Sequence, residues 1–125
     1  MDQPQKDLNW EQWQRKGAEV FRITGAFCLL SAEKMDALRD AAKALDAKRV
    51  VMDMREVPYM DSAGLGVIAL IARYASANDA ALVIVPSAQV RKLMNTTGID
   101  RVVHFAENIP SAIDLDVQRP AAPPE

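Results

Sequence analysis

Apolar residues follow two different periods along the chain. Short, mostly apolar runs predict strands over residues 18–24, 49–54, 81–85 and 102–105. The run at 49–54 is apolar on both faces, as expected of a central strand that is covered from both sides.

Between these runs, apolar residues recur every three or four positions, which predicts helices. The predicted helices are 32–46 after Ser31, 61–77, one from Ser87 to Gly98, and a last one opened by Asn108 and Pro110. Serine and asparagine are favoured N-caps, and glycine is favoured just beyond a helix C-terminus. The helix at 61–77 is apolar almost all round, so we expect it to be heavily buried.

The segment 9–15 (NWEQWQR) is ambiguous. It could be an edge strand that precedes the strand 18–24. Trp10 and Trp13 are three residues apart, however, and this spacing suits one face of a helix better than one face of a strand. The sequence assigns no role to this segment.

Strands and helices alternate from residue 18 onward, which predicts an α/β fold with a mixed, mostly parallel sheet and right-handed crossovers. We expect four to five strands and about four helices. We expect the chain of 125 residues to contain one domain, over residues 9–117. Residues 1–8 are expected to be a flexible N-terminus, and 118–125 a flexible tail rich in proline and alanine.

Composition excludes several classes of function. A net charge of −2 and a pI near 5.4 give no electrostatic reason to bind nucleic acid. The apolar stretches are too short to span a bilayer, and the polar N-terminus is no signal peptide. One cysteine, Cys28, excludes an internal disulfide, and one histidine, His104, excludes a multi-histidine metal site. We therefore expect a cytoplasmic protein without a cofactor or metal, whose oligomeric state stays open.

The stretch YMDSAGLG at 59–66 stands where the helix 61–77 begins. Glycine inside a helix costs roughly 1 kcal/mol relative to alanine, so two glycines here need a reason. Asp61 can cap the helix, and Ser62 would then point its hydroxyl outward. Gly64 and Gly66 would leave the surface beside Ser62 open to a bulky partner. In a parallel sheet, loops that follow the carboxyl ends of strands are where sites are built.

Three other interpretations of this corner compete. The letters G-x-G-x-x-A at 64–69 suggest a dinucleotide site, but those glycines are not in the turn directly after a strand. Asp53 near a strand end suggests a phosphate-accepting receiver domain, but no acidic pair follows the strand 18–24 to hold magnesium. A purely structural interpretation makes Ser62 a cap residue and lets the glycines serve close packing of the helix on the sheet.

The run at 50–68 resembles the signature of the STAS family, the sulfate-transporter and anti-sigma-antagonist domains. It has an apolar strand that ends in Asp-Met, a short loop, two apolar residues, Asp-Ser-x-Gly-Leu and an apolar helix. The order of elements over 9–117 agrees more loosely, and Thr-Gly-Ala-Phe at 24–27 falls where the family has a glycine-containing turn. The resemblance implies a STAS-like domain over 9–117.

The resemblance also implies a function, that of an anti-sigma factor antagonist. The serine of the signature, here Ser62, is then the phosphorylation site. The unmodified protein binds an anti-sigma factor, a serine kinase of the histidine-kinase-like ATPase fold. Phosphorylation releases the protein, and a metal-dependent serine phosphatase resets it. The implied residues that shape the interface are Asp53, Met60, Asp61, Ala63, Gly64, Leu65 and Gly66.

The residues are compatible with such a switch. A phosphate on Ser62 adds about −1.5 to −2 charges at a helix N-terminus and would disfavour docking of an apolar or acidic partner. We expect Asp61, and Asp53 if it lies near, to add repulsion, with Asp53 otherwise accepting hydrogen bonds from loop N–H groups. No base accompanies Ser62, so we expect no enzymatic activity. The alternative is an unphosphorylated STAS scaffold or accessory subunit, in a stress-signalling assembly or beside a lipid-transport ATPase.

Overall fold

The structure is a computed structural model that describes residues 7–117. The segments 1–6 and 118–125, which fall in the expected flexible N-terminus and tail, lie outside the described residues. Leu8 belongs to the same expected flexible N-terminus, yet its side chain is fully buried in the core. Packing of the domain therefore includes at least one residue before Asn9.

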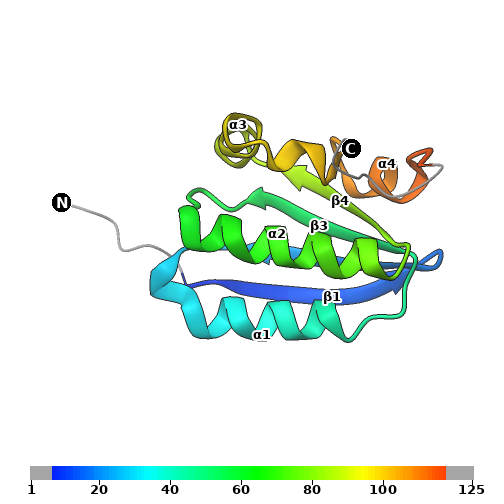
Figure 1. The fold of residues 1–125 in the computed structure, drawn as a ribbon, viewed down its shortest axis with the longest axis horizontal. Helices are drawn as coiled ribbons and strands as arrows, with labels where there is room; N and C mark the ends of the chain where they lie inside the picture. Colours follow the sequence, from blue (N-terminus) through cyan, green and yellow to red (C-terminus); the bar gives the residue numbers. More distant parts are fainter. Residues whose placement is uncertain (1–6, 118–125) are drawn as a thin grey trace.

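Five strands form one sheet in the order β1-β2-β3-β4-β5 (Figure 1). Strand β1 (Asn9–Arg15) runs antiparallel to β2 (Ala18–Thr24). The remaining neighbours, β3 (Arg49–Glu56), β4 (Ala81–Pro86) and β5 (His104–Phe105), pair in parallel. The predicted mixed, mostly parallel α/β sheet is confirmed.

Three strand boundaries differ from the prediction, and the smallest difference is in β4, which ends at Pro86, one residue after the predicted position 85. Strand β3 extends two residues past Met54, since Arg55 and Glu56 continue the sheet beside β2. Strand β5 contains only His104 and Phe105. The residues before β5 form a short 3-10 helix, Ile99–Arg101. The amide of Val102 donates to the carbonyl of Ile99 at 2.9 Å, as part of this helical turn. Val102 therefore closes this turn and does not pair with β4.

Four α-helices connect or follow the strands: α1 (Ala32–Lys43), α2 (Ser62–Ala77), α3 (Ala88–Thr97) and α4 (Ile109–Asp114). Helix α1 ends three residues before the predicted position 46, where the amide of Leu45 bonds to Ala42 in a tighter turn. Ser87 caps α3, and Gly98 follows it in the left-handed region with φ of 86°, as predicted. Ser31 precedes α1, but its hydroxyl donates to the carbonyl of Ala26 and does not cap the helix.

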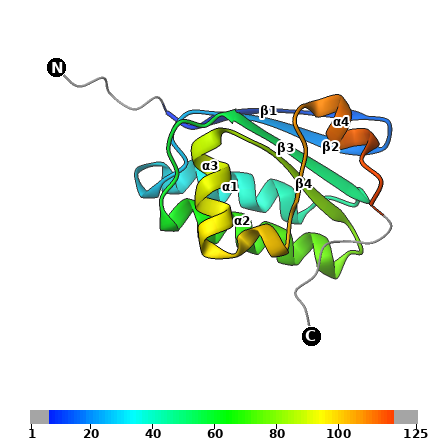
Figure 2. The ribbon, with the colours of Figure 1, turned by 90° about the horizontal axis from the view of Figure 1, so that it is seen from above.

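Helices α1, α2 and α3 cover one face of the sheet, and α4 lies on the opposite face (Figure 2). Successive residues of a strand point to opposite faces. In β3, Met52 and Met54 pack under α2 in the larger core cluster, while Val51 packs under α4 in the smaller one. Both faces of β3 are thus buried, as the apolar run predicted.

The segment 9–15 is the edge strand. Trp10 packs against the larger core cluster and Trp13 against the smaller one, on the face of α4. A spacing of three places two strand residues on opposite faces. The spacing that favoured a helix therefore reflects one tryptophan for each side of the sheet.

Two loops meet where α2 begins. The amide of Phe27 donates to the carbonyl of Tyr59 at 2.9 Å, and Phe27 forms a β-bridge with Met60. Gly64, in the first turn of α2, lies directly against Phe27. A Cβ atom at position 64 would overlap the carbonyl oxygen of Phe27 and lie 2.7 Å from its Cδ2. The absence of a side chain at Gly64 allows α2 to pack against the loop between β2 and α1.

Replacing Gly64 by alanine should therefore destabilise the fold. We expect Gly64→Ala to lower the free energy of unfolding by about 1–3 kcal/mol, because backbone must move to make room. Gly66→Ala is the matched control, since nothing lies within 4 Å of a Cβ at that position. It should raise the free energy of unfolding by up to about 1 kcal/mol through helix propensity. Urea denaturation followed by circular dichroism measures both, and equal effects would contradict this role of Gly64.

Candidate functional site

The carboxylate of Asp61 joins two elements at the start of α2. Its Oδ1 accepts a hydrogen bond from the amide of Gly64 at 3.0 Å, and its Oδ2 accepts one from the amide of Leu29 at 3.0 Å. The first bond caps α2, as the sequence predicted. The second reaches across to the loop between β2 and α1, so one side chain fixes both segments at the carboxyl end of the sheet.

These amides also set the charge of Asp61. Partial desolvation opposes ionisation, but the N–H groups of Leu29, Gly64 and Ala63 together outweigh it and lower the pKa of the carboxyl below its usual value. Asp61 is therefore an anion throughout the neutral range. A negative charge next to Ser62 is a fixed feature of the site.

Ser62 is the first residue of α2, and its side chain is exposed. Within residues 7–117, its hydroxyl makes no hydrogen bond to the protein, since Asp61 and not Ser62 satisfies the first turn of the helix. The hydroxyl is therefore accessible from outside. The neighbouring Asp61 carboxylate already accepts the amides of Gly64 and Leu29.

The two segments that meet at this helix start carry exposed apolar side chains. The exposed fractions of Leu29, Leu30 and Tyr59 are 68%, 91% and 47%. Leu29 and Leu30 follow β2, and Tyr59 precedes α2, so the two loops that meet at Asp61 carry all three. We call Leu29, Leu30 and Tyr59 the apolar rim. Large apolar side chains are seldom left exposed together unless another protein covers them.

A groove continues this surface toward α3. Its volume is about 490 Å³, and it lies between the segment 58–60 and α3. Its lining includes Tyr59, Lys92 and Leu93. Tyr59 belongs both to the rim and to the lining of the groove, so the groove begins at the segment that precedes Ser62.

Several predicted interface residues at the start of α2 are buried or half-buried. Met60 and Gly64 are buried in the domain, although Met60 also lines the groove beside α3. Ala63 and Leu65 are half-buried and pack against the core. Of the two glycines predicted to open the surface, Gly64 and Gly66, only Gly66 is exposed, and nothing lies within 4 Å of a Cβ atom at position 66. The idea that both glycines clear a docking surface is wrong for Gly64, which serves close packing as in the structural interpretation.

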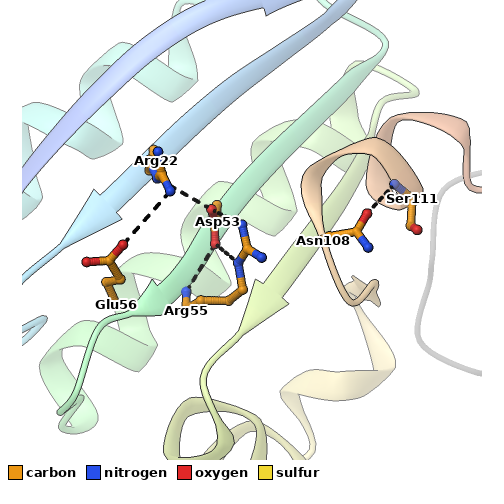
Figure 3. Close-up of polar contacts among 6 residues, drawn as sticks. All are labelled: Arg22, Asp53, Arg55, Glu56, Asn108 and Ser111. Atoms are coloured by element: carbon orange, nitrogen blue, oxygen red, sulfur yellow. Dashed lines mark hydrogen bonds and ion pairs between the residues drawn. The ribbon is translucent and has the colours of Figure 1, made fainter.

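The prediction for Asp53 also needs correction. Its carboxylate is buried at 3% exposure and lies on the face of α4, across the sheet from α2 and Ser62. Two arginines hold it: Arg55 through its Nε and Nη2, each at 2.9 Å, and Arg22 at 3.8 Å (Figure 3). The amide of Arg55 also donates to it, but this is a strand amide and not a loop amide. Asp53 is a paired structural anion that does not face Ser62.

The other chemical candidates offer no site. Among residues 7–117, no group of three His, Cys, Asp or Glu side chains could hold a metal ion, and Cys28 is buried. Burial, and then the charge of Arg49, lower the pKa of His104, which stays neutral among apolar residues under α4. In the described part of the chain, no helix has the length and apolar character needed to cross a membrane.

Sequence reasoning missed the apolar rim. Leu29 and Leu30 follow the strand 18–24 but precede the periodic pattern of α1. Two adjacent leucines outside any predicted strand or helix were the available signal, because large apolar residues in a loop either pack into the core or stay exposed at the surface. Only the structure shows that these two point outward.

Removing the Asp61 carboxylate should loosen the site. We expect Asp61→Ala to lower the free energy of unfolding by about 0.5–2 kcal/mol at pH 7, the usual cost of losing an N-cap. Because the folded-state pKa is lowered, the stabilisation is complete above the unfolded value of about 3.9 and is lost as the pH falls through the folded value. The difference from wild type should therefore shrink below about pH 4. Urea denaturation at several pH values measures it, with Asp116→Ala, an exposed aspartate outside any helix, as the control.

Comparisons with known proteins agree with this architecture. The family model of the STAS domain matches residues 9–112. The structure is similar to an anti-sigma factor antagonist from Mycobacterium paratuberculosis, with a TM-score of 0.78 and 17% identity over 86% of this chain and 92% of that one. It is also similar to an anti-sigma factor antagonist from Thermotoga maritima described as putative, with a TM-score of 0.70 and 16% identity over 84% and 92% of the two chains.

The Bacillus cell fate determinant SpoIIAA, also an anti-sigma factor antagonist, is similar in both of its forms. The unphosphorylated form has a TM-score of 0.63 at 19% identity over 86% of this chain and 94% of that one. The phosphorylated form has a TM-score of 0.61 at 22% identity over 85% and 97%. At these identities the likeness concerns the fold, and the match of the family model over most of the length carries the assignment. The chain belongs to the STAS domain family.

Proposed function

We propose that this protein is an anti-sigma factor antagonist whose docking is controlled by phosphorylation of Ser62. In the unmodified state it binds an anti-sigma factor that is also a serine kinase, and so makes a sigma factor available. The observation that carries the proposal is the exposed Ser62 hydroxyl, which has no hydrogen bond within residues 7–117 and stands beside the apolar rim. Similarity to antagonists with this fold supports it.

The apolar rim supplies the attraction. Covering Leu29, Leu30 and Tyr59 removes apolar surface from water, which contributes about 25 cal/mol per Å². A kinase must also bring its active site to the Ser62 hydroxyl. Because rim and hydroxyl belong to the same corner, one surface serves both as the docking site and as the substrate.

Phosphorylation then opposes docking by charge. The phosphate would sit at the N-terminus of α2, where the helix dipole tolerates an anion. The Asp61 carboxylate beside it is already ionised and already uses its oxygens on the amides of Gly64 and Leu29. Burying the added charge against an apolar or acidic surface can cost about 3 kcal/mol, which weakens binding by roughly a hundredfold. No refolding is needed, because the bonds that fix α2 do not involve the Ser62 hydroxyl.

The remaining parts of the cycle lie outside this chain. The kinase is of the histidine-kinase-like ATPase type, and a metal-dependent phosphatase removes the phosphate. This chain contributes no catalytic group and requires no cofactor of its own. It acts in the cytoplasm, where its partners are.

The central test combines intact mass with binding. Incubation with an anti-sigma factor serine kinase and ATP should add about 80 Da, the mass of one phosphate, and Ser62→Ala should abolish the gain. Ser62→Asp should weaken binding to the kinase at least tenfold in calorimetry. Ser111 is the matched control, since it is an exposed serine in the first turn of α4. Ser111→Asp should change neither result, and a Ser62→Asp protein that binds like Ser62→Ala would contradict the electrostatic switch.

The apolar rim gives a second prediction. Leu30→Ser should weaken kinase binding about tenfold, because Leu30 is 91% exposed in the free protein and becomes buried only in the complex. Its melting temperature should match that of wild type, because the side chain adds little to the core. Unchanged affinity would place the docking surface elsewhere.

The same experiments distinguish the alternative of a STAS scaffold or accessory subunit. Such a protein would keep the apolar rim but gain no mass with any kinase. Stable co-purification with a transport ATPase or a multi-subunit signalling assembly, unaffected by Ser62→Asp, would favour that role.

A further inference from the structure

The outer edge of the sheet carries a strand that can still pair. Within residues 7–117, strand β1 is the first strand in the sheet and is bonded only to β2. Asn9, Glu11, Gln12, Gln14 and Arg15 are exposed. An edge strand of this length offers a row of free backbone donors and acceptors, which is a template for a further strand.

The hairpin turn fixes which residues face outward. Arg15 pairs with Ala18 across Lys16 and Gly17, whose φ angles of 52° and 80° are those of a type I′ turn. In a two-residue hairpin, the residues that flank the turn form the hydrogen-bonded pair, and bonded and non-bonded positions then alternate. The backbone groups of Arg15, Trp13 and Glu11 therefore point to β2. Those of Gln14, Gln12 and Trp10 point away from the sheet.

The outward positions match a second copy of the same strand. In an antiparallel arrangement with Trp13 opposite Trp13 of the other copy, Gln12 lies opposite Gln14, and both use outward backbone groups. Trp13 then occupies a non-hydrogen-bonded pair, where side chains come closest and an aromatic pair is favourable. On each side of this pair, Glu11 of one copy faces Arg15 of the other.

Only this register pairs the charges. A shift by two residues in one direction places Glu11 opposite Trp13 and Asn9 opposite Arg15. A shift in the other direction places Arg15 opposite Trp13. Both shifted registers lose the Glu11–Arg15 pairs, and the sign alternation in β1 thus selects one alignment.

The charged side chains of Glu11 and Arg15 have no ion-pair partner within the described part of the chain. Among residues 7–117, neither Glu11 nor Arg15 forms an ion pair, and Arg22, which lies opposite Glu11 in β2, contacts Asp53 and Glu56 instead. Charged side chains on an edge strand discourage pairing, and like charges directly opposite each other are destabilising. Here a second copy brings the opposite sign to each charge.

We propose that two copies of this protein form a dimer through antiparallel pairing of their β1 strands, centred on Trp13. The two five-stranded sheets then continue into one another about a twofold axis. Because each β2 runs antiparallel to its own β1, the parallel strands of the two copies point in opposite directions. The two Ser62 residues lie at opposite ends of the joined sheet, so the dimer leaves both exposed. The inference stands independently of the proposed function.

Sedimentation of charge-reversal variants tests the dimer. Wild-type protein should sediment as a dimer toward the upper end of a range from roughly 1 to 300 μM, since a two-strand interface is small and of modest affinity. Glu11→Arg and Arg15→Glu each place like charges opposite one another twice, and each should weaken the dimer about tenfold. An equimolar mixture of the two variants should form a heterodimer at least as tight as the wild-type dimer, because every facing pair again has opposite signs.

Two further measurements test whether the dimer forms through the backbone of β1. Gln14→Pro removes one outward donor without touching a bond to β2, and it should abolish dimerisation while the circular dichroism spectrum stays unchanged. In the wild type, amide exchange at Trp10, Gln12 and Gln14 should slow as the concentration rises. A wild type that stays monomeric throughout would overturn the proposal. So would a dimer that is indifferent to both reversals, or a mixture that fails to associate.

Discussion

The carboxylate of Asp61 is the interaction on which the rest of the site depends. One oxygen accepts the amide of Gly64 and the other accepts the amide of Leu29, so a single side chain caps α2 and fastens the preceding loop to it. The bonds use both oxygens and keep the group ionised. As a result, the Ser62 hydroxyl is not needed as a helix cap, and it stands at a fixed place on the surface. Leu29 is fixed at its backbone while its side chain stays exposed.

Rigidity at this corner explains why a charge can act there without a change of fold. Phe27 is tied to Tyr59 and Met60 by backbone pairing, and Gly64 lets α2 pack directly on Phe27. The two loops and the helix start thus form one packed unit beneath the exposed side chains. In the proposed switch, a phosphate changes what can approach this unit while the unit itself stays in place.

The sheet separates the chemistry of the molecule into distinct regions. The end of the sheet beside α2 carries Ser62 and the apolar rim. The face of α4 carries the ion pairs of Asp53 with Arg22 and Arg55, where a buried carboxylate is matched by two half-exposed guanidinium groups. The lateral edge carries β1. In the two proposals, partner docking uses the side chains around Ser62, while self-association uses the backbone of β1.

Periodicity and local chemistry determined most of the fold from the sequence. The alternation of strands and helices, the caps at Asp61, Ser87 and Asn108, and the left-handed Gly98 depend on neighbours within a few residues, so the sequence contains the information. The outward position of Ser62 followed from the same local geometry. Contacts between segments that are far apart in the sequence were decided only by the tertiary structure. The approach of Phe27 to Gly64, the face on which Asp53 lies and the exposure of Leu29 and Leu30 depend on how strands pair and which face a helix covers, and no local pattern encodes those contacts.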